Sequence, residues 1–383
     1  MLVLGAGLQG SACAYDLLKN PDVERVVLAD LRTDALPPYL APHRGDPRLE
    51  LRTLDARDGD AVRTAMQGVN ACMNALPYYF NEDISKAAAE VGVHGCDLGG
   101  NTEIVFRQIE LHDAARAKGI SIIPDCGLAP GMVNILAQAG MDALESVDSV
   151  RIRVGGLPQH PKPPLNYQIV YSIEGVLDYY TTPSWVVRDG RPLEVEALSE
   201  IEPVDFPEPV GRLEAFHTAG GLSTMAWTHE GRVRSMEYKT LRYPGHAELM
   251  RVIRELGLLD LEPVEVDGHP VVPRDVFIAC VEPRLRRPAG RDLVALRVEA
   301  EGQRDGRPRR IVFDLLDYYD ETVGVSAMER TTGFSLSITG QLQATGAITA
   351  TGVRTPDQAV PADRYLEELA KRGIRIERRG EDL

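Results

Sequence analysis

The sequence predicts an α/β protein with an N-terminal Rossmann domain on a parallel sheet, a second mixed α/β domain with a largely antiparallel sheet, and C-terminal helices that return to the first domain. Three observations predict it. The stretch GAGLQG directly follows an apolar run at the start of the chain, strands then alternate with helical patterns as far as residue 144, and strand-like runs dominate from residue 150. We expect residues 1–130 and 331–383 to form the first domain and residues 131–330 the second.

The first half alternates strands and helices in the way that parallel βαβ units do. Strands are expected at residues 1–4, 23–29, 49–54, 69–75, 94–98 and 120–123. Helices are expected between them at residues 11–20, 58–67, 81–91 and 104–118, and a further helix at residues 131–144 leaves the first domain.

From residue 150 the pattern predicts a mixed domain with antiparallel hairpins, because Asp-Gly turns recur at residues 189–190, 267–268 and 305–306. Strands are expected at residues 150–154, 167–171, 185–188, 232–242, 292–300, 310–316 and 322–328, and helices at 173–180, 247–255 and 274–285. The tail turns helical again at residues 334–345 and 363–372, the latter closed by Gly373, and we expect it to pack on the first domain.

The composition excludes several classes of function. The net charge of −15 is spread along the chain and opposes nucleic-acid binding, because phosphate backbones attract clustered cations. No run is apolar enough to span a membrane, and the first residues enter a strand without a signal peptide. Four of the five cysteines lie in apolar segments without metal-ligand spacing, which predicts reduced buried thiols in a cytoplasmic protein that binds no metal.

GAGLQG has the context of a dinucleotide-binding fingerprint, because it follows a strand, opens a helix and precedes an acid, Asp30, at the end of the next strand. Gly5 permits the tight turn, Gly7 lets the backbone approach a pyrophosphate, and Gly10 allows close helix–strand packing. Asp30 can accept hydrogen bonds from both ribose hydroxyls and would repel a 2′-phosphate, so NAD is favoured, while Arg32 leaves NADP possible. The alternative is a glycine-rich turn without a ligand. The residues expected to bind the cofactor are Gly5, Ala6, Gly7, Leu8, Gln9, Gly10, Asp30, Leu31, Asn74, Ala75, Leu76, Pro77 and Leu98.

Open parallel sheets bind ligands beyond the carboxyl ends of their strands. Three such ends carry polar or backbone-shaping residues, in the stretches NALPYYFN (74–81), DLGGN (97–101) and PDCGLAPG (124–131). Asp97 and Asp125 therefore lie where a substrate would meet the nicotinamide and are candidate catalytic residues, and Tyr79 is a candidate to hydrogen-bond the reacting group. The alternative for Asp125 is a bond to backbone amides at a helix N-terminus.

Nine stretches, in the same order and over nearly the whole chain, resemble the saccharopine dehydrogenase-like family. They are specific for the family and less specific for one substrate. They are VLGAGLQG, NALPYYFNEDISKAAAEVGVHGCDLGG, IIPDCGLAPGMVNILA, VGGLP, YSIEGVLDYYTTP, EAFHTAGGLSTM, EYKTLRYPGHAE, MERTTGF and AVPADRYLEELAKRGI.

The resemblance is strongest to the lysine 6-dehydrogenases within that family. It implies an NAD(P)-dependent oxidoreductase that oxidises the ε-amino group of L-lysine, a small amino-acid substrate, to an imine, which hydrolyses to ammonia and allysine; allysine cyclises to piperideine carboxylate. It also implies a homodimer or larger homo-oligomer, with the first domain binding NAD and the second serving substrate binding and oligomerisation.

Amine oxidation sets chemical requirements that the second half can meet. A lysine ammonium, with a pKa of about 10.4, must lose a proton before hydride leaves the adjacent carbon, and the substrate carboxylate needs an anchor. Alternation along a strand puts Tyr238, Thr240 and Arg242 on one face, and the Arg242 guanidinium matches a carboxylate at two points unless it forms a surface ion pair. His217 is a candidate base, with a structural histidine as the alternative. Further expected substrate residues are Thr218, Glu214, His246 and Arg330.

Two rival functions stay open. Another reaction of the family, the reductive joining of an amine and an oxo acid of the saccharopine or carboxynorspermidine type, would need cations for a second carboxylate, which Arg212, Arg242 and Arg330 could supply. A dinucleotide-sensing or scaffold protein would need the fingerprint alone.

Overall fold

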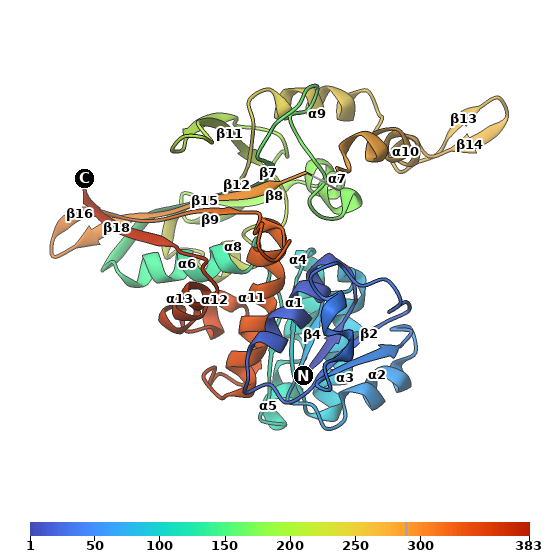
Figure 1. The fold of residues 1–383 in the computed structure, drawn as a ribbon. Helices are drawn as coiled ribbons and strands as arrows, with labels where there is room; N and C mark the ends of the chain where they lie inside the picture. The colour runs from blue at the N-terminus through green and yellow to red at the C-terminus, as the bar shows by residue number, and fades with distance from the viewer. Residues whose placement is uncertain (288–289) are drawn as a thin grey trace.

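The computed structural model describes residues 1–287 and 290–383. Figure 1 shows two halves, with the N-terminus in the Rossmann half, the second sheet above it and helix α11 (Ala327–Ala344) running between them. The predicted α/β class is confirmed.

The first sheet has seven strands in the order β17-β6-β5-β4-β1-β2-β3, and every pair in it is parallel. The strand order reverses between β1 and β4: β2 and β3 follow on one side of β1, and β4, β5 and β6 follow on the other. Open parallel sheets bind ligands at such a reversal of strand order. The strands are β1 (Leu2–Leu4), β2 (Val26–Asp30), β3 (Leu49–Thr53), β4 (Ala71–Asn74), β5 (His94–Asp97), β6 (Ser121–Ile123) and β17 (Gly352–Val353).

Two helices of this half begin where a local side chain accepts hydrogen bonds from their first backbone amides. Asp58 caps α2 (Gly59–Met66) by accepting from Asp60 and Ala61, and Asn101 caps α4 (Thr102–Ile109) by accepting from Ile104. The remaining helices are α1 (Leu8–Lys19), η1 (Ala41–Gly45), η2 (Tyr78–Phe80), α3 (Asn81–Val91), α5 (His112–Ala117) and α6 (Met132–Asp142).

The second sheet is largely antiparallel, as predicted. Its order is β10-β11-β12-β7-β15-β16-β18, with β8 beside β12 and β9, and the pair β12–β7 is parallel. The Asp-Gly turns join β8 to β9, β13 to β14 and β15 to β16, and all three aspartates have positive φ. The strands are β7 (Ser146–Pro158), β8 (Ser184–Arg188), β9 (Arg191–Val195), β10 (Glu202–Asp205), β11 (Arg212–His217), β12 (Val233–Arg242), β15 (Asp292–Arg304), β16 (Arg307–Tyr318) and β18 (Glu377–Asp382).

One segment of the second half projects from the body (Figure 1). Its outermost part is the isolated hairpin of β13 (Val264–Val266) and β14 (His269–Val271), which α10 (Pro273–Leu285) follows and which α9 (His246–Glu255), lying over the second sheet, precedes. We call residues 246–285 the arm. Two further helices, α7 (Ile173–Thr181) and α8 (Met225–Thr228), pack on the body of this half.

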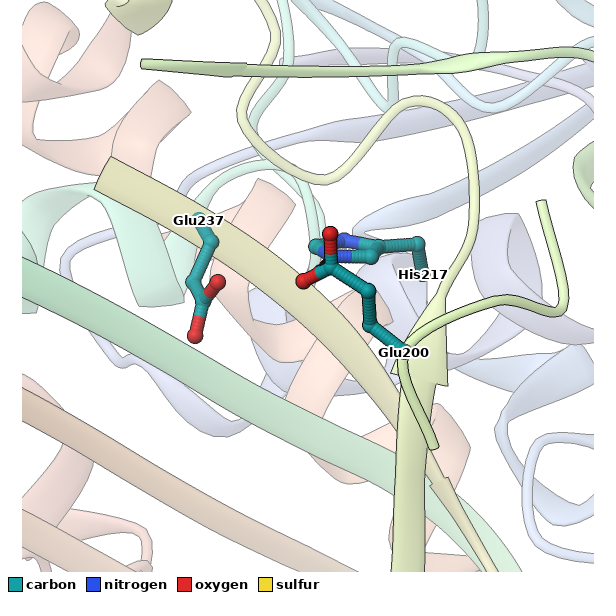
Figure 2. A group of neighbouring side chains, drawn as sticks. All are labelled: Glu200, His217 and Glu237. Atoms are coloured by element: carbon teal, nitrogen blue, oxygen red, sulfur yellow. Dashed lines mark hydrogen bonds and ion pairs between the residues drawn. The ribbon is translucent and has the colours of Figure 1, made fainter. Parts of the chain in front are cut away.

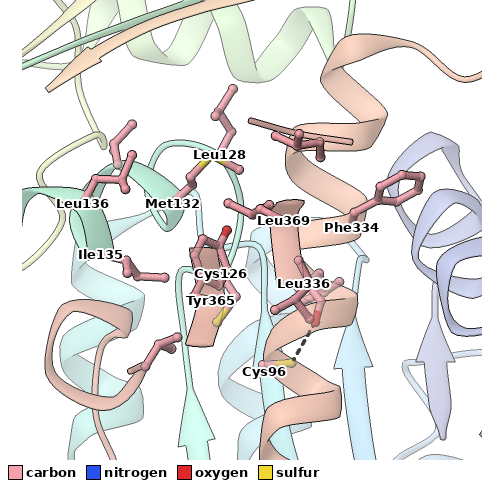
Figure 3. Close-up of a cluster of buried hydrophobic side chains, with 14 of the residues drawn as sticks. Cys96, Cys126, Leu128, Met132, Ile135, Leu136, Phe334, Leu336, Tyr365 and Leu369 are labelled. Atoms are coloured by element: carbon pink, nitrogen blue, oxygen red, sulfur yellow. Dashed lines mark hydrogen bonds between the residues drawn. The ribbon is translucent and has the colours of Figure 1, made fainter. Parts of the chain in front are cut away.

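The C-terminal helices return to the first domain, as predicted, and α11 packs on α1, β4 and β5. Figure 3 shows the core that joins α11 and α13 (Ala362–Lys371) to β5 and α6, with Cys96, Leu336 and Tyr365 among its side chains. Short α12 (Pro356–Ala359) packs on α6, whereas β18 pairs with β16 of the second sheet. The residue bounds of the two domains stay a prediction.

Two expected strands are wrong. Residues 167–171 form irregular backbone, because Tyr167 and Gln168 are both buried and alternation is absent there. Residues 322–328 form a turn and the start of α11, because Ser326 and Glu329 make a reciprocal capping box. The expected helix at 104–118 divides into α4 and α5, and β9, β10, β11, β13, β14, β17 and β18 were not predicted.

The cysteines follow their sequence context. Cys13, Cys72, Cys96 and Cys126 are buried free thiols, and Cys280 is an exposed one. Among the helices of residues 1–287 and 290–383, none is long and apolar enough to cross a membrane.

Candidate active site

A cavity of about 720 Å³ lies where the carboxyl ends of the first sheet face the second domain. The glycine-rich loop and the segments after β4, β5 and β6 form one wall. The opposite wall comes from β7, α7, β12 and the first turns of α11. The position is the one expected for the ligand site of an open parallel sheet.

Gly5 and Gly10 have the backbone geometry expected of them, a tight turn and a close approach. Gly5 has a φ of +96°, and a Cβ on Gly10 would lie 1.8 Å from the Gly5 carbonyl oxygen, so both positions exclude a side chain. A Cβ on Gly7 would meet nothing within 4 Å, because this residue faces the cavity. The side-chain amide of Gln9 also lines the cavity, and its nitrogen and oxygen are buried without a partner in the described chain.

These features fit a nicotinamide dinucleotide. Gly7 leaves room for a pyrophosphate at the N-terminus of α1, and Gln9 holds an unused donor and acceptor beside it. Asp30, at the end of β2, accepts hydrogen bonds from the Ala6 amide (2.7 Å) and the Arg32 amide (3.0 Å), which places its carboxylate against the glycine-rich loop. Leu8, Ala75, Leu76, Pro77 and Leu98 line the cavity, and Leu31 is exposed after Asp30.

Asn74 and Asp97 lie behind the cavity wall and shape its loops. Asn74 donates to Asn81 (2.8 Å), and Asn81 donates to Asp97 (3.0 Å). Asp97 also accepts from the Gly99 amide (2.7 Å) and from Gln108 (2.7 Å). Burial raises the pKa of Asp97 to about 6, against the lowering effect of these hydrogen bonds. Neither Asn74 nor Asp97 lines the cavity.

Asp125 joins the two domains just behind Gly99. It is buried with a φ of +64°, and its Oδ2 accepts a hydrogen bond from the Ser223 hydroxyl. Its Oδ1 has no partner in the described chain and lies 1.8 Å from where a Cβ on Gly99 would stand, so Gly99 keeps this space open. Burial, and next the charge of Asp97, raise the pKa of Asp125 to about 8.

The stretch PDCGLAPGMVN thus ties the first domain to a loop of the second. Asn134, in α6, donates to the carbonyls of Gly221 (3.1 Å) and Leu222 (3.3 Å), in the same loop as Ser223. That loop packs against the Tyr238 ring, because a Cβ on Gly221 would lie 2.3 Å from ring atoms.

Strand β12 presents Tyr238, Thr240 and Arg242 to the cavity, as alternation predicts. The Thr240 hydroxyl lies 2.7 Å from the Thr218 hydroxyl and 3.3 Å from that of Tyr238. Thr218 therefore supports the cavity wall without lining it.

Arg242 is a buried cation at the cavity wall, with 3% of its surface exposed. Its Nε donates to the Tyr180 hydroxyl (3.2 Å), its Nη1 donates to the Leu241 carbonyl (2.8 Å), and the guanidinium lies over the Tyr167 ring (4.9 Å). Within the described chain it forms no ion pair, and its Nη2 has no hydrogen-bond partner. A buried guanidinium without a counter-ion is unfavourable, so this side chain is suited to an anionic ligand.

His217 points away from the cavity. It lies opposite Lys239 in the β11–β12 pair, and Lys239 faces the other side of the sheet from Tyr238 and Thr240. Its Nε2 lies 3.1 Å from Glu200 and its Nδ1 3.2 Å from the Tyr238 carbonyl, and burial lowers its pKa although the Glu200 bond opposes this. This placement does not favour His217 as the base.

Figure 2 shows Glu200, His217 and Glu237 together, a group that sequence reasoning missed. Their ligand atoms lie within 4.8 Å of one another and could hold a metal ion. Arg188 pairs with both Glu200 (3.0 Å) and Glu237 (2.7 Å), so the carboxylates already have a counter-ion.

Three other predicted substrate residues lie outside the cavity. Glu214 accepts from the Gly245 amide (2.8 Å) and the Ala247 amide (2.7 Å) at the start of α9. Arg330 pairs with Asp317 (2.9 Å), and His246 is buried beside Tyr180. Tyr79 lines the cavity rim with 62% of its surface exposed.

Among the cavity residues that sequence reasoning missed, the charged ones lie on α7. Glu174 and Asp178 are the carboxylates that line the cavity in the described chain, and Tyr171 and Tyr179 line it with them. Glu174 and Asp178 are four residues apart on α7, so one helix face was the available signal. Of the neighbouring pair Tyr179 and Tyr180, the first lines the cavity and the second accepts a hydrogen bond from Arg242.

Fold and cavity together define an oxidoreductase that uses a nicotinamide dinucleotide. Two family models then cover the chain: the saccharopine dehydrogenase NADP binding domain matches residues 1–123, and the saccharopine dehydrogenase C-terminal domain matches residues 127–374. The chain belongs to the saccharopine dehydrogenase family.

Curated relatives are distant. A saccharopine dehydrogenase [NADP(+), L-glutamate-forming] of Schizosaccharomyces pombe is 22% identical over 405 residues, which cover 87% of this chain and 89% of that protein. The mitochondrial alpha-aminoadipic semialdehyde synthase of Rattus norvegicus is 22% identical over 275 residues, which cover 68% of this chain and 28% of the relative. The match therefore spans less than a third of that longer protein.

Solved structures show the same fold. The apo saccharopine dehydrogenase (L-Glu forming) of Saccharomyces cerevisiae aligns with a TM-score of 0.79 at 21% identity and covers 99% of each chain. The homospermidine synthase of Legionella pneumophila in complex with NAD aligns with a TM-score of 0.71 at 10% identity, over 100% of this chain and 91% of the other.

Proposed function

We propose that this oxidoreductase catalyses the NAD-dependent oxidative deamination of the ε-amino group of L-lysine to allysine and ammonia. The observation that carries the proposal is the charge of the cavity. Arg242 is the one basic side chain that lines it in the described chain, and Glu174 and Asp178 are the acidic ones. Asp178 also pairs with Arg274 (2.6 Å), which does not line the cavity, so Glu174 is the lining carboxylate without an ion pair in the described chain. One cation and one available carboxylate suit a substrate that carries a carboxylate and an amino group.

The rival reaction needs more cations than the cavity offers. Saccharopine carries several carboxylates, and each requires a donor or counter-ion when desolvated. Arg212 is an exposed partner of Asp205, and Arg330 pairs with Asp317 away from the cavity. The charge pattern therefore favours lysine over a product of reductive joining.

The proposed reaction consumes lysine, NAD⁺ and water and releases allysine, ammonia, NADH and a proton. Bound NAD⁺ supplies the hydride acceptor. The substrate carboxylate would pair with Arg242, and its ammonium must lose a proton before oxidation. Asp125 does not line the cavity, because Gly99 stands between them, but it is the proposed proton acceptor because its Oδ1 is unused there and its raised pKa lies nearer to that of an amine.

Nicotinamide absorbance tests the proposal directly. L-lysine should reduce NAD⁺, and saccharopine should not. Arg242→Lys keeps the charge but loses the two-point geometry, and weakening a buried charge pair costs about 2–5 kcal/mol, so the KM for lysine should rise at least tenfold. Arg212→Lys is the control. Turnover of saccharopine alone would support the rival reaction, and NAD binding without any turnover would support the non-enzyme reading.

The rate of lysine oxidation should rise above pH 7 and peak near pH 9 to 10 as an order-of-magnitude expectation, because the ammonium and its acceptor lose protons there. Asp125→Asn should remove most of kcat and flatten the rising limb. A maximum at or below pH 7 would contradict amine oxidation, and an unchanged limb in the variant would exclude Asp125 as the acceptor.

A further inference from the structure

Arg242 is held by a chain of hydrogen bonds that leads away from the cavity. Its Nε donates to the Tyr180 hydroxyl (3.2 Å), that hydroxyl lies 2.9 Å from Nε2 of His246, and Nδ1 of His246 lies 3.0 Å from the Leu165 carbonyl. All three side chains are buried, and neither Tyr180 nor His246 lines the cavity.

Donor and acceptor roles in this chain have one consistent solution. A guanidinium can only donate, so the Tyr180 oxygen accepts from Arg242 and its proton must go to Nε2 of His246. The Leu165 carbonyl can only accept, so Nδ1 of His246 carries the imidazole proton. Because the ring is buried beside the Arg242 cation, it is neutral, with its proton on Nδ1 and with Nε2 as the acceptor for Tyr180.

We propose that Tyr180 and His246 are positioning residues that fix the guanidinium of Arg242 so that its free edge faces the substrate. This inference rests on the proposed function of Arg242 as the carboxylate anchor. The sequence predicted that His246 binds substrate. The proposal instead gives His246 the role of orienting Arg242, which binds it.

Local geometry explains why such support is needed. The Tyr167 ring covers one face of the guanidinium at 4.9 Å but leaves rotation in its plane free. The bonds from Nε to Tyr180 and from Nη1 to Leu241 fix that rotation and leave Nη2 unbonded in a residue that lines the cavity. A neutral His246 is required beside this cation, and its pKa is lowered to about 3, by burial first and by Arg242 next.

The tautomer can be tested without any substrate. Histidine labelled with ¹⁵N gives distinct shifts for protonated and unprotonated ring nitrogens, and His246→Gln identifies the signals of His246 among the eight histidines. At pH 7 we expect a protonated Nδ1 and an unprotonated Nε2. The opposite tautomer or an imidazolium would refute the proposed relay, the hydrogen-bond chain from Arg242 through Tyr180 to His246, whatever the protein oxidises.

Kinetics test the role. Tyr180→Phe should raise the KM for L-lysine about tenfold, with kcat and the KM for NAD changed less than twofold. Tyr243→Phe is the matched control, since it removes a hydroxyl bonded to the Pro158 carbonyl (3.0 Å) one residue from Arg242. His246→Phe should raise the KM in the wild type and add nothing in Tyr180→Phe, whereas His246→Gln should restore part of the affinity.

Equal effects of His246→Phe in both backgrounds, or an unchanged KM in Tyr180→Phe, would overturn the proposal. Absence of lysine oxidation in the wild type would instead refute the proposed function, and the ¹⁵N shifts would still decide whether the relay exists.

Discussion

Asp30 is the residue on which the choice between NAD and NADP depends. Its carboxylate is held by the amides of Ala6 and Arg32, beside the glycine-rich loop, where it would repel a 2′-phosphate. The matched family model and the fission yeast relative are named for NADP, so this prediction separates the chain from them.

Replacing Asp30 with alanine should raise the KM for NAD, because the acceptor for the ribose hydroxyls is lost. It should also reduce the ratio of kcat/KM for NAD to kcat/KM for NADP, because the repulsion of a 2′-phosphate is lost. Steady-state kinetics with each cofactor measures this ratio. Arg32→Ala is the companion variant and should widen the ratio by removing a cation that could meet the phosphate. A ratio unchanged in Asp30→Ala would remove this residue from cofactor selection.

Residue roles that follow from backbone geometry could be predicted from the sequence, and those that depend on register could not. Gly5 and Gly10 have the expected backbone geometry because a fingerprint constrains backbone shape directly. His217 was a reasonable base by residue type, but only its pairing opposite Lys239 shows that it faces away from the cavity.

At the scale of elements, the loop between β11 and β12 shapes the cavity through a glycine that leaves room for the Tyr238 ring. A Cβ on Gly221 would lie 2.3 Å from the Tyr238 ring, and Gly221 has no positive φ, so space alone forbids a larger residue. Gly221→Ala should displace Tyr238, destabilise the fold by about 1–3 kcal/mol and weaken lysine binding.

Urea unfolding and the KM values for lysine and NAD measure these effects. Only the KM for lysine should rise. Gly45→Ala is the control, because a Cβ there meets nothing within 4 Å and no positive φ is involved. A Gly221→Ala variant as stable and active as the control would show that Tyr238 moves aside freely.

The elements themselves were predicted where periodicity was strong. The alternating strands and helices of the first half emerged because each has a regular apolar pattern, whereas β10 and β18 are short, mostly exposed strands with none. The start of α11 was missed although Ser326 and Glu329 have capping-box spacing, because the β-branched residues before them read as a strand.

At the scale of the whole molecule, the arm is where we expect the predicted homo-oligomer to form. Its hairpin stands alone, and isolated hairpins are marginally stable in water. More than half of the exposed large apolar side chains in the described chain lie on it, and such concentrations mark contact surfaces. They are Leu249, Val252, Leu256, Leu258, Leu261, Val264, Val266 and Val276.

Light scattering after size exclusion should therefore give a mass well above the 42.0 kDa of one chain. The double variant Leu256→Glu and Leu261→Glu should elute nearer to one chain, because charges would be buried in the contact. Leu193→Glu, on β9 outside the arm, should keep the wild-type mass. A wild type of one-chain mass would refute the oligomer.

The stability of the whole molecule should fall as pH rises, because it buries several carboxyl groups with raised pKa values. Burial raises the pKa of Asp97, Asp292 and Asp357 to about 6 and that of Asp125 to about 8. The folded state therefore binds more protons than the unfolded chain, in which an aspartate has its ordinary pKa of 3.8. Their contribution is complete below pH 4 and is lost as pH rises through 6 to 8.

Carboxylates paired with arginines affect stability in the opposite direction, because they lose their contribution as the pH falls. Partners such as Arg310 and Arg151 lower the pKa of Glu301 despite its burial, so its contribution is lost only as pH falls below about 4.5. Urea unfolding from pH 4.5 to 9 should thus show the highest free energy of unfolding near pH 5 and a decline above it. Each unit of pKa shift corresponds to at most about 1.4 kcal/mol. Asp125→Asn should reduce the decline in the free energy of unfolding between pH 7 and 9, and Asp113→Asn, at an exposed position, should not change it.

A free energy of unfolding that rises from pH 5 to 9 would mean that these carboxyl groups are ionised and paired in the folded protein.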